Sequence, residues 1–250
     1  MSKHPFGSYP DLKGKTAVIT SNWAGIEREL CEAFLQNEIR TVLLGPLAHS
    51  AMDDPIGETP SDVWKIDVDL MDPEQMKGAF GQILPWARQV DILINCASGS
   101  DHPKVLTDIT DREWHRMLNE TLGSAFYGCR EVLPGMLNAA WGRIINVSSQ
   151  AATNPPTISA THYAAAEAGI LGLTRHTARE YGMRGITCNA IIRGATGASR
   201  SEHQNLMSGS PDGLLSEPWT TASAILFLVS NGAGNVNGAT LNLTAGRDMT

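Results

Sequence analysis

Tyr163 and Glu167 are the two side chains whose spacing bears most directly on proton transfer. They lie four residues apart in a stretch with helical periodicity, so their side chains share one face of the helix. A carboxylate beside a phenol raises the pKa of the phenol, because it disfavours a second negative charge. Tyr163 is therefore predicted to be a poor general base at neutral pH.

Several hydrogen-bond donors accompany this pair and could support a different acid–base chemistry. Ser149 precedes Tyr163 by fourteen residues, and His102 and His162 are groups of a type that titrates near neutral pH. With Glu167 as a carboxylate base, these side chains could carry out a dehydration, an isomerisation or a cyclisation. The simpler interpretation of the two histidines, as solvated residues of a loop and a helix start, stays open.

Strands and helices alternate along the chain that must position these residues. Short apolar runs predict strands over 16–20, 41–44, 63–68, 91–95, 143–147, 186–192 and 239–243, and helical periodicity predicts helices over 26–37, 73–83, 111–137, 162–181 and 220–230. This alternation is typical of βαβ units, so we expect an α/β fold: one Rossmann-type, doubly wound parallel sheet in three α/β/α layers. No repeat or linker divides the sequence, and residues 1–250 are expected to form one domain.

A doubly wound sheet also predicts where a ligand binds. The ligand crevice of such folds lies outside the carboxyl ends of the strands, near the point where the strand order reverses. We therefore expect the site to be formed by the loops that follow Thr20, Leu44, Asn95, Val147 and Ile192.

Composition and charge restrict the partners and the compartment. The chain has 19 basic and 26 acidic residues, a net charge of −7, which disfavours nucleic acid and anionic membrane surfaces as partners. Its four cysteines are scattered without metal-ligand spacing, so we expect reduced thiols and no metal site. The first residues have no apolar signal region, and no apolar stretch is long enough to span a bilayer. We expect a cytoplasmic protein.

Four parts of the sequence resemble motifs of the short-chain dehydrogenase/reductase family, over almost the whole chain. They are residues 20–27 in place of TGxxxGIG, 91–98 in place of the strand end D-hydrophobic-NNAG, 146–149 with 163–167 in place of NxSS and YxxxK, and 189–194 in place of NxIxPG. The resemblance implies a Rossmann fold and, for ordinary members, NAD(P)-dependent chemistry. It also implies that Ser149 would hold the substrate oxygen and that Tyr163 would move the proton.

The cofactor positions depart from the family pattern. Ser21 and Glu27 replace two glycines of the first turn, where only Gly25 remains. A carboxylate at position 27 takes the space and the sign of charge that a diphosphate needs. Three further positions give weak support: Gly45, which is neither acidic nor basic; Asp69, an adenine contact or an ordinary strand-end residue; and Asn95. No cofactor is therefore expected to bind.

The catalytic positions depart as well. Thr121 stands where the resemblance implies an asparagine of the proton relay, and Asn119 lies two residues too early. Glu167 replaces the lysine that would lower the pKa of the tyrosine. Ser149 and Tyr163 are then vestigial, and ordinary carbonyl reduction is expected to be excluded.

Three hypotheses follow for the function. The first is a non-catalytic pseudoenzyme subunit that assembles with a homologous active subunit in a hetero-oligomer, expected to be a tetramer, whose complex is an NAD(P)-dependent oxidoreductase. In this hypothesis the chain resembles the inactive subunit of the acyl-CoA alcohol dehydrogenase of anaerobic toluene degradation. The second is a cofactor-independent lyase, isomerase or cyclase in the old pocket. The third is an atypical but active NAD(P)-dependent oxidoreductase.

Overall fold

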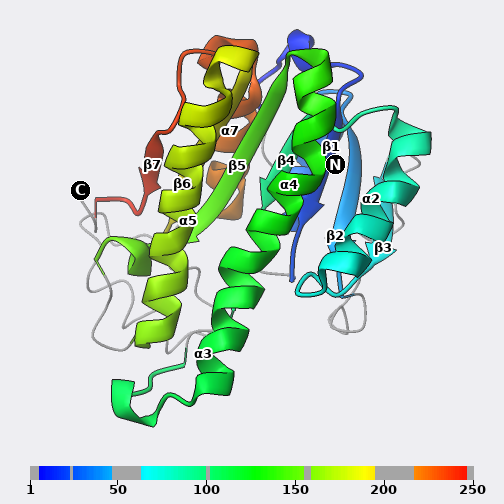
Figure 1. The fold of residues 1–250 in the computed structure, drawn as a ribbon. Helices are drawn as coiled ribbons and strands as arrows, with labels where there is room; N and C mark the ends of the chain where they lie inside the picture. The colour runs from blue at the N-terminus through cyan, green and yellow to red at the C-terminus, as the bar shows by residue number, and fades with distance from the viewer. Residues whose placement is uncertain are drawn as a thin grey trace.

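Seven parallel strands form the sheet around which the chain is organised (Figure 1). The strands are β1 (Thr16–Thr20), β2 (Arg40–Gly45), β3 (Val63–Asp67), β4 (Ile92–Asn95), β5 (Gly142–Ser149), β6 (Ile186–Arg193) and β7 (Thr240–Leu243). Their order in the sheet is β3-β2-β1-β4-β5-β6-β7, so the order reverses between β1 and β4. The expected doubly wound parallel sheet is confirmed. This computed structural model describes residues 6–22, 25–46, 63–99, 102–154, 159–194 and 217–246.

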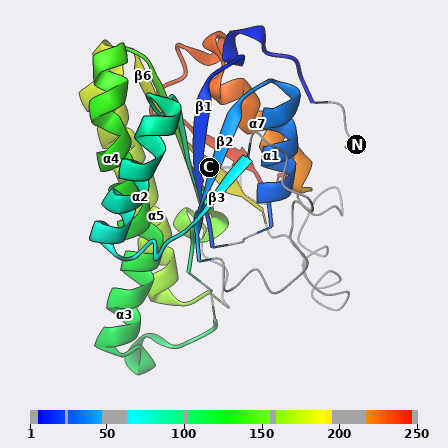
Figure 2. The same cartoon turned by 90° about the vertical axis from the view of Figure 1, so that its right-hand side faces the viewer.

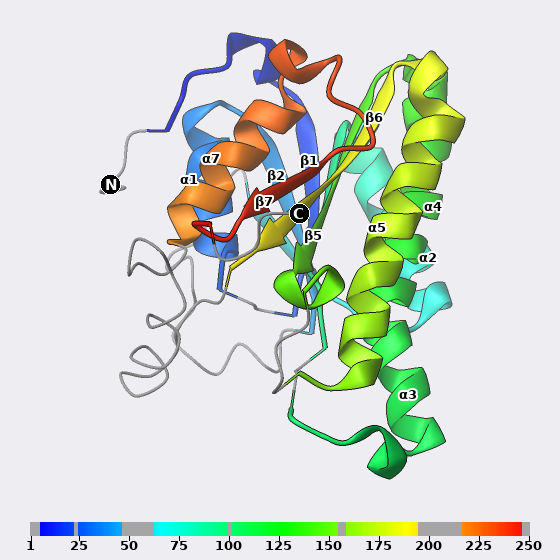
Figure 3. The same ribbon diagram turned by 90° about the vertical axis from the view of Figure 1, so that its left-hand side faces the viewer.

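Helices cover both faces of the sheet. They are α1 (Glu27–Gln36), α2 (Pro73–Ala87), α3 (Asp111–Leu118), α4 (Ser124–Ala139), α5 (Thr161–Tyr181) and α7 (Pro218–Val229). Figures 2 and 3 show α2, α4 and α5 on one face and α1 and α7 on the other, while α3 extends beyond one end of the sheet. Short 3-10 turns complete the described part: Pro10–Leu12, Leu106–Asp108, Gln150–Ala152, Gly182–Arg184 and Asn231–Ala233.

Each face of the sheet has its own apolar core. One core packs β1 and its neighbours against α1 and α7, and the other packs the opposite face against α2, α4 and α5. All five residues of β1 are buried, which explains why a strand covered on both faces has a continuous apolar run in the sequence. In the described part of the chain, every helix is too short or too polar to cross a membrane.

The helix expected over 111–137 is interrupted. A capping box between Thr110 and Glu113 starts α3, and a π-helical turn, Asn119–Gly123, separates it from α4. The hydroxyl of Ser124 donates to the carbonyls of Glu120 and Thr121 at 2.8 and 3.0 Å. Helical periodicity in the sequence predicted one continuous helix and did not reveal this turn. Such turns are frequent at functional sites.

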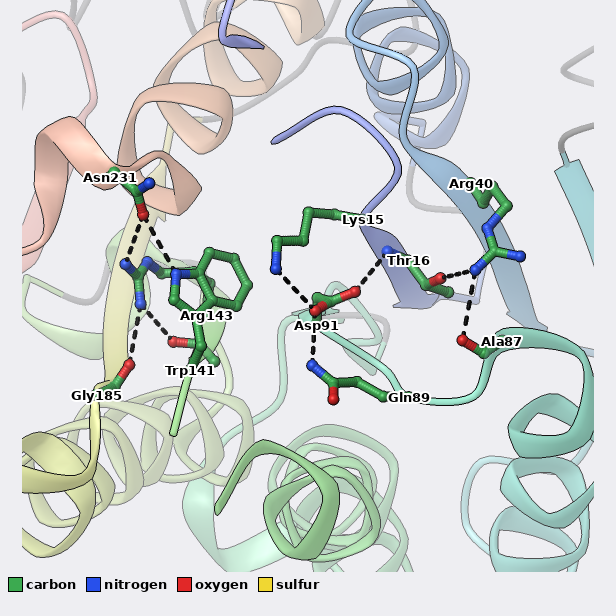
Figure 4. Close-up of polar contacts among 11 residues, drawn as sticks. Lys15, Thr16, Arg40, Ala87, Gln89, Asp91, Trp141, Arg143, Gly185 and Asn231 are labelled. Atoms are coloured by element: carbon green, nitrogen blue, oxygen red, sulfur yellow. Dashed lines mark hydrogen bonds and ion pairs between the residues drawn. The ribbon is translucent and has the colours of Figure 1, made fainter. Parts of the chain in front are cut away.

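A polar network fastens the amino-terminal edge of the sheet (Figure 4). The buried Asp91 carboxylate accepts hydrogen bonds from Lys15 Nζ at 3.2 Å, the backbone N–H of Thr16 at 2.9 Å and Gln89 Nε2 at 2.7 Å. The Trp141 ring has the Lys15 ammonium 4.0 Å and the Arg143 guanidinium 4.4 Å from its centre. These contacts hold together the amino ends of the strands, at the end of the sheet opposite their carboxyl ends.

Candidate functional site

Glu167 is the centre of the polar cluster at the carboxyl end of β5. It lies on the side of α5 that packs on this strand, and its side chain is 1% exposed. Its Oε1 atom accepts a hydrogen bond from Ser98 Oγ at 2.6 Å. Its Oε2 atom accepts from Ser148 Oγ at 2.9 Å and from the backbone N–H of Ser149 at 3.1 Å. The Tyr163 hydroxyl, one helical turn earlier, also donates to this carboxyl group.

Burial is the largest influence on the pKa of this carboxyl group. Removal from water raises the pKa of Glu167 above its usual value, and the hydrogen bonds from Ser98, Ser148, Ser149 and Tyr163 oppose the effect only in part. A buried carboxyl group with a raised pKa is a common feature of sites that move protons.

Ser149 and Tyr163 meet at this cluster from different elements. Ser149 is the last residue of β5, where its Oγ atom accepts from the backbone N–H of Ala151 at 3.2 Å. Tyr163 is half-buried in the first turn of α5. A hydroxyl that accepts one hydrogen bond can still donate another, so Ser149 and Tyr163 provide two hydroxyl donors near one strand end.

Thr121 lies in the π-helical turn and not at a regular helical position. Its buried Oγ1 atom accepts from the backbone N–H of Gly99 at 3.0 Å. Asn119 faces elsewhere: its side chain donates to the carbonyl of Met71 at 2.9 Å and accepts from the Tyr127 hydroxyl at 3.0 Å. Thr121 thus holds the loop after β4.

The first turn, between β1 and α1, is organised by Glu27. Its side chain is 2% exposed, and its carboxylate accepts hydrogen bonds from the Ser21 hydroxyl and, at 2.8 Å, from the backbone N–H of Gly25. Gly25 has a φ of 90°, which a residue with a side chain rarely adopts. The carboxylate therefore already accepts a hydrogen bond from one N–H group of the turn. The Glu27 side chain is buried in the protein and is not exposed at the surface of the turn.

A cleft of about 560 Å³ lies beside this turn, at the carboxyl ends of β1, β2 and β3. Its lining includes Asn22, Pro46, Asp67, Val68, Asp69, Met71, Gln75, Arg116 and Glu120. Gly45 ends β2 against the first turn, where a Cβ atom would collide with the carbonyl oxygen of Ser21. Asp69 is exposed and accepts from the backbone N–H of Met71 at 2.9 Å. The volume is typical of a small-molecule site.

Asn22 connects the cleft to the Glu167 cluster. Its side chain donates to the carbonyl of Ser98 and accepts from the backbone N–H of Ser98 at 3.4 Å. Because Ser98 also donates to Glu167, one chain of hydrogen bonds runs from the cleft to the carboxyl group. The cleft and the cluster therefore belong to one site.

Asn95 lies beneath the site in a row of buried polar side chains. It accepts from Thr20 Oγ1 at 3.1 Å and donates to Asn146 Oδ1 at 2.8 Å. Asn146 in turn donates to Thr174 on α5 at 2.9 Å. The contacts of Asn95 therefore hold the ends of β1, β4 and β5 in register.

The two histidines lie at a separate cavity. His102 and His162 line a space of about 250 Å³ together with Lys104, Glu113, Arg116, Met117 and Glu120. Lys104 pairs with Glu113 at 2.6 Å. The sequence hypothesis joined both histidines to Glu167, whereas the structure places them around this second cavity. Among the described residues, no group of three or more His, Cys, Asp or Glu side chains is arranged to hold a metal ion.

Ser98 and Ser148 are site residues that sequence reasoning missed. Both bond directly to Glu167, yet the sequence analysis named them only as members of the segments 91–98 and 146–149 and gave neither a role. The available signal was a polar residue at the end of each of two strand runs that are otherwise apolar, which places both hydroxyls at the carboxyl edge of the sheet.

Comparisons with known proteins agree with this geometry. The model of the short chain dehydrogenase family matches residues 15–207. The 3-oxoacyl-(acyl-carrier-protein) reductase FabG of Vibrio harveyi is 30% identical over 247 residues, 96% of this chain and 99% of the relative. The reductase of the same name from Pseudomonas aeruginosa is 31% identical over 249 residues, with the same shares covered. The crystal structure of gox2181 covers 94% of this chain and 96% of its own, with a TM-score of 0.85 at 24% identity, and it shows a likeness of fold alone.

These relatives overturn two expectations from the sequence. The non-catalytic subunit is wrong as the main hypothesis, because relatives matched over nearly their whole length are named as reductases. The absence of a cofactor is wrong as well, because a reductase of this family takes its hydride from a nicotinamide cofactor. Both errors came from treating each changed motif residue as a lost function. In the structure the Glu27 carboxylate is folded inward, and Glu167 is hydrogen-bonded to Tyr163.

Proposed function

We propose that this chain, which belongs to the short chain dehydrogenase family, is an active reductase that converts a ketone to an alcohol with NAD(P)H. The observation that carries the proposal is the cluster at the end of β5, where the Tyr163 hydroxyl and Ser149 are held around one buried carboxyl group beside the cleft. Relatives named as reductases support it.

The residues of the cleft and the first turn fit a dinucleotide. The cleft, with Asp69 and Pro46 in its lining, would take the adenosine end. Ile26 at the start of α1 makes no side-chain capping bond, so the N–H groups of the first helical turn are placed to bind the diphosphate. Glu27 lowers the affinity through its charge. The bound cofactor supplies a hydride to the carbonyl carbon.

The protein groups hold and protonate the carbonyl oxygen. Ser149 Oγ donates a hydrogen bond to that oxygen, and the Tyr163 hydroxyl donates the proton that converts it to an alcohol. Reduction requires a neutral phenol, which is the ordinary form of a tyrosine at neutral pH. The sequence argument against reduction treated Tyr163 as a base, whereas in the direction of reduction it acts as an acid.

The relatives also indicate a substrate class. The curated relatives are named for the reduction of 3-oxoacyl groups on acyl carrier protein, so a 3-oxoacyl thioester is the proposed substrate type. The proposal also covers location and assembly. The four cysteines are free and buried, which supports a cytoplasmic location. Assembly with a homologous subunit stays a prediction, which Phe126 supports because it remains 45% exposed on α4.

The test is the oxidation of NADPH or NADH by the purified chain with a 3-oxoacyl thioester such as acetoacetyl-CoA. We expect turnover, and we expect Tyr163→Phe to lower kcat about 100-fold or more, because the proton donor is lost. Tyr127→Phe removes a hydroxyl that bonds to Asn119 and serves as the matched control with near-normal kcat. Turnover that is the same in Tyr163→Phe would contradict the proposal, as would conversion of the substrate without a cofactor.

A further inference from the structure

We infer that Glu167 carries a proton and passes it to the Tyr163 oxygen during reduction, so that a carboxylic acid supplies protons where the family resemblance implies a lysine. The inference rests on the proposed reductase function and adds a positioning residue that acts through Tyr163. The carboxyl group lies in contact with Tyr163 and with the hydroxyl of Ser98.

The hydrogen bonds around Glu167 accommodate a proton without leaving a polar atom unsatisfied. Oε2 accepts from the backbone N–H of Ser149, which can only donate, and from Ser148. Oε1 faces the Ser98 hydroxyl at 2.6 Å. Because serine and tyrosine hydroxyls both donate and accept, a proton on the carboxyl group can be donated to Ser98, which faces Oε1, or to Tyr163, which also contacts this group. The cluster thus has a place for the proton on the side of Oε1.

The surroundings of Glu167 favour its neutral form. Burial is the largest influence on the pKa of this carboxyl group and raises it. The charged or titratable side chains on the elements around it include Arg193 on β6, next to Ser149 in the sheet, Glu120 in the π-helical turn, Arg116 on α3, and His162 and Tyr163 on α5. They carry charges of both signs, so they do not replace burial as the main influence.

The proton transfers balance in each turnover. The carbonyl carbon takes a hydride, with its two electrons, from the reduced cofactor, and the carbonyl oxygen takes the proton of Tyr163. The Tyr163 oxygen takes the proton of Glu167, and Glu167 recovers a proton from water. When Glu167 is ionised, it accepts the Tyr163 hydroxyl and competes with the substrate for that proton. Reduction should therefore slow as the pH rises through the pKa of Glu167.

The first measurement is the pH dependence of kcat for ketone reduction in the wild-type protein, Glu167→Gln and Glu180→Gln. Above the pKa of Glu167, the wild-type kcat should fall about tenfold per pH unit, following the protonated fraction. The amide of Glu167→Gln can hold the Tyr163 oxygen by a hydrogen bond but has no proton to pass to it, so the kcat of this variant should lie below the wild-type value at low pH and should lack the decline with pH. Glu180 is an exposed carboxylate on the same helix, and its variant should retain the decline.

Two further readouts do not depend on that variant's turnover. The infrared difference between wild type and Glu167→Gln, without cofactor and at a pH below the decline in kcat, should contain the band of a protonated carboxylic acid. Ser98→Ala removes a hydrogen bond that lowers the pKa of Glu167, so its decline in kcat should move to higher pH. This variant keeps the test valid if Glu167→Gln does not fold.

The two proposals fail in different ways. If ketones are reduced and the wild-type decline persists in Glu167→Gln, or does not move in Ser98→Ala, the inference about Glu167 is wrong and the reductase function stands. An infrared spectrum with only an ionised Glu167 at a pH below the decline in kcat also overturns the inference. If the wild-type protein reduces no ketone with either cofactor, the proposed function falls and the proton transfer falls with it, even where the acid band is present.

Discussion

At the residue scale, the site is defined by what surrounds Glu167. The sequence predicted that Tyr163 and Glu167 share a helix face, because the four-residue spacing is local. It could not predict that Ser98 and Ser148 bond to the same carboxyl group, since these contacts span 69 and 19 residues. It also could not give the burial of Glu167, which depends on how α5 packs on β5. Burial is what raises the pKa of this group.

The raised pKa has a consequence for stability. A carboxyl group with a raised pKa in the folded protein contributes its full stability below the unfolded value, and that contribution is lost as the pH rises through the folded value. Each unit of the shift lowers the free energy of unfolding by about 1.4 kcal/mol above that pH. Glu167→Gln has no such loss.

The expected result is a free-energy difference between wild type and Glu167→Gln that changes in favour of the variant as the pH rises from acid to alkaline values. Urea unfolding of both proteins at several pH values measures it, with Glu180→Gln as the exposed control. A difference that is constant over this range would mean that Glu167 has an ordinary pKa.

At the element scale, the strands were predicted well and the connections less well. Short apolar runs predicted all seven strands; the inner strands β1, β4, β5 and β6 are almost wholly buried, whereas the edge strand β7 is only partly buried. The π-helical turn at Asn119–Gly123 was missed, and so was the inward fold of Glu27. The sequence correctly indicated a carboxylate in the first turn of α1 but could not show that it accepts the Gly25 N–H.

Glu27 is expected to weaken cofactor binding through its charge. Glu27→Gln keeps the size of the side chain and removes a negative charge near the diphosphate, so the Kd for NADPH should fall about tenfold, equivalent to about 1.4 kcal/mol. Calorimetric titration measures the change. Glu29→Gln removes the same charge two residues further along α1 and should change the Kd much less. An unchanged or larger Kd in Glu27→Gln would show that the diphosphate does not approach this turn.

At the scale of the whole molecule, the carboxyl ends and the amino ends of the strands have different roles. The carboxyl edge carries the cleft and the Glu167 cluster, and the amino-terminal edge carries the network around Asp91 (Figure 4). The sequence predicted the first edge as the site from topology alone. It gave no indication of the second network, whose partners come from separate parts of the chain.

Asp91→Ala should therefore lower stability without changing catalysis. Loss of a buried carboxylate leaves Lys15, the Thr16 N–H and Gln89 without their acceptor, and we expect the free energy of unfolding to fall by about 3 kcal/mol. Lys13→Ala breaks the exposed Lys13–Glu38 pair near the same edge and should cost less than about 1 kcal/mol. Urea unfolding and kcat are measured on both variants. A large change in the kcat of folded Asp91→Ala would show that the two edges are coupled.

Direct titration is the best test of whether this chain binds a nicotinamide cofactor in the cleft beside Glu27. Purified wild-type protein is titrated with NADPH and with NADH by isothermal calorimetry, up to millimolar ligand. We predict binding of at least one of them with a Kd below about 100 µM, equivalent to about 5.5 kcal/mol. The absence of binding to either cofactor, by protein that unfolds cooperatively on heating, would contradict the account.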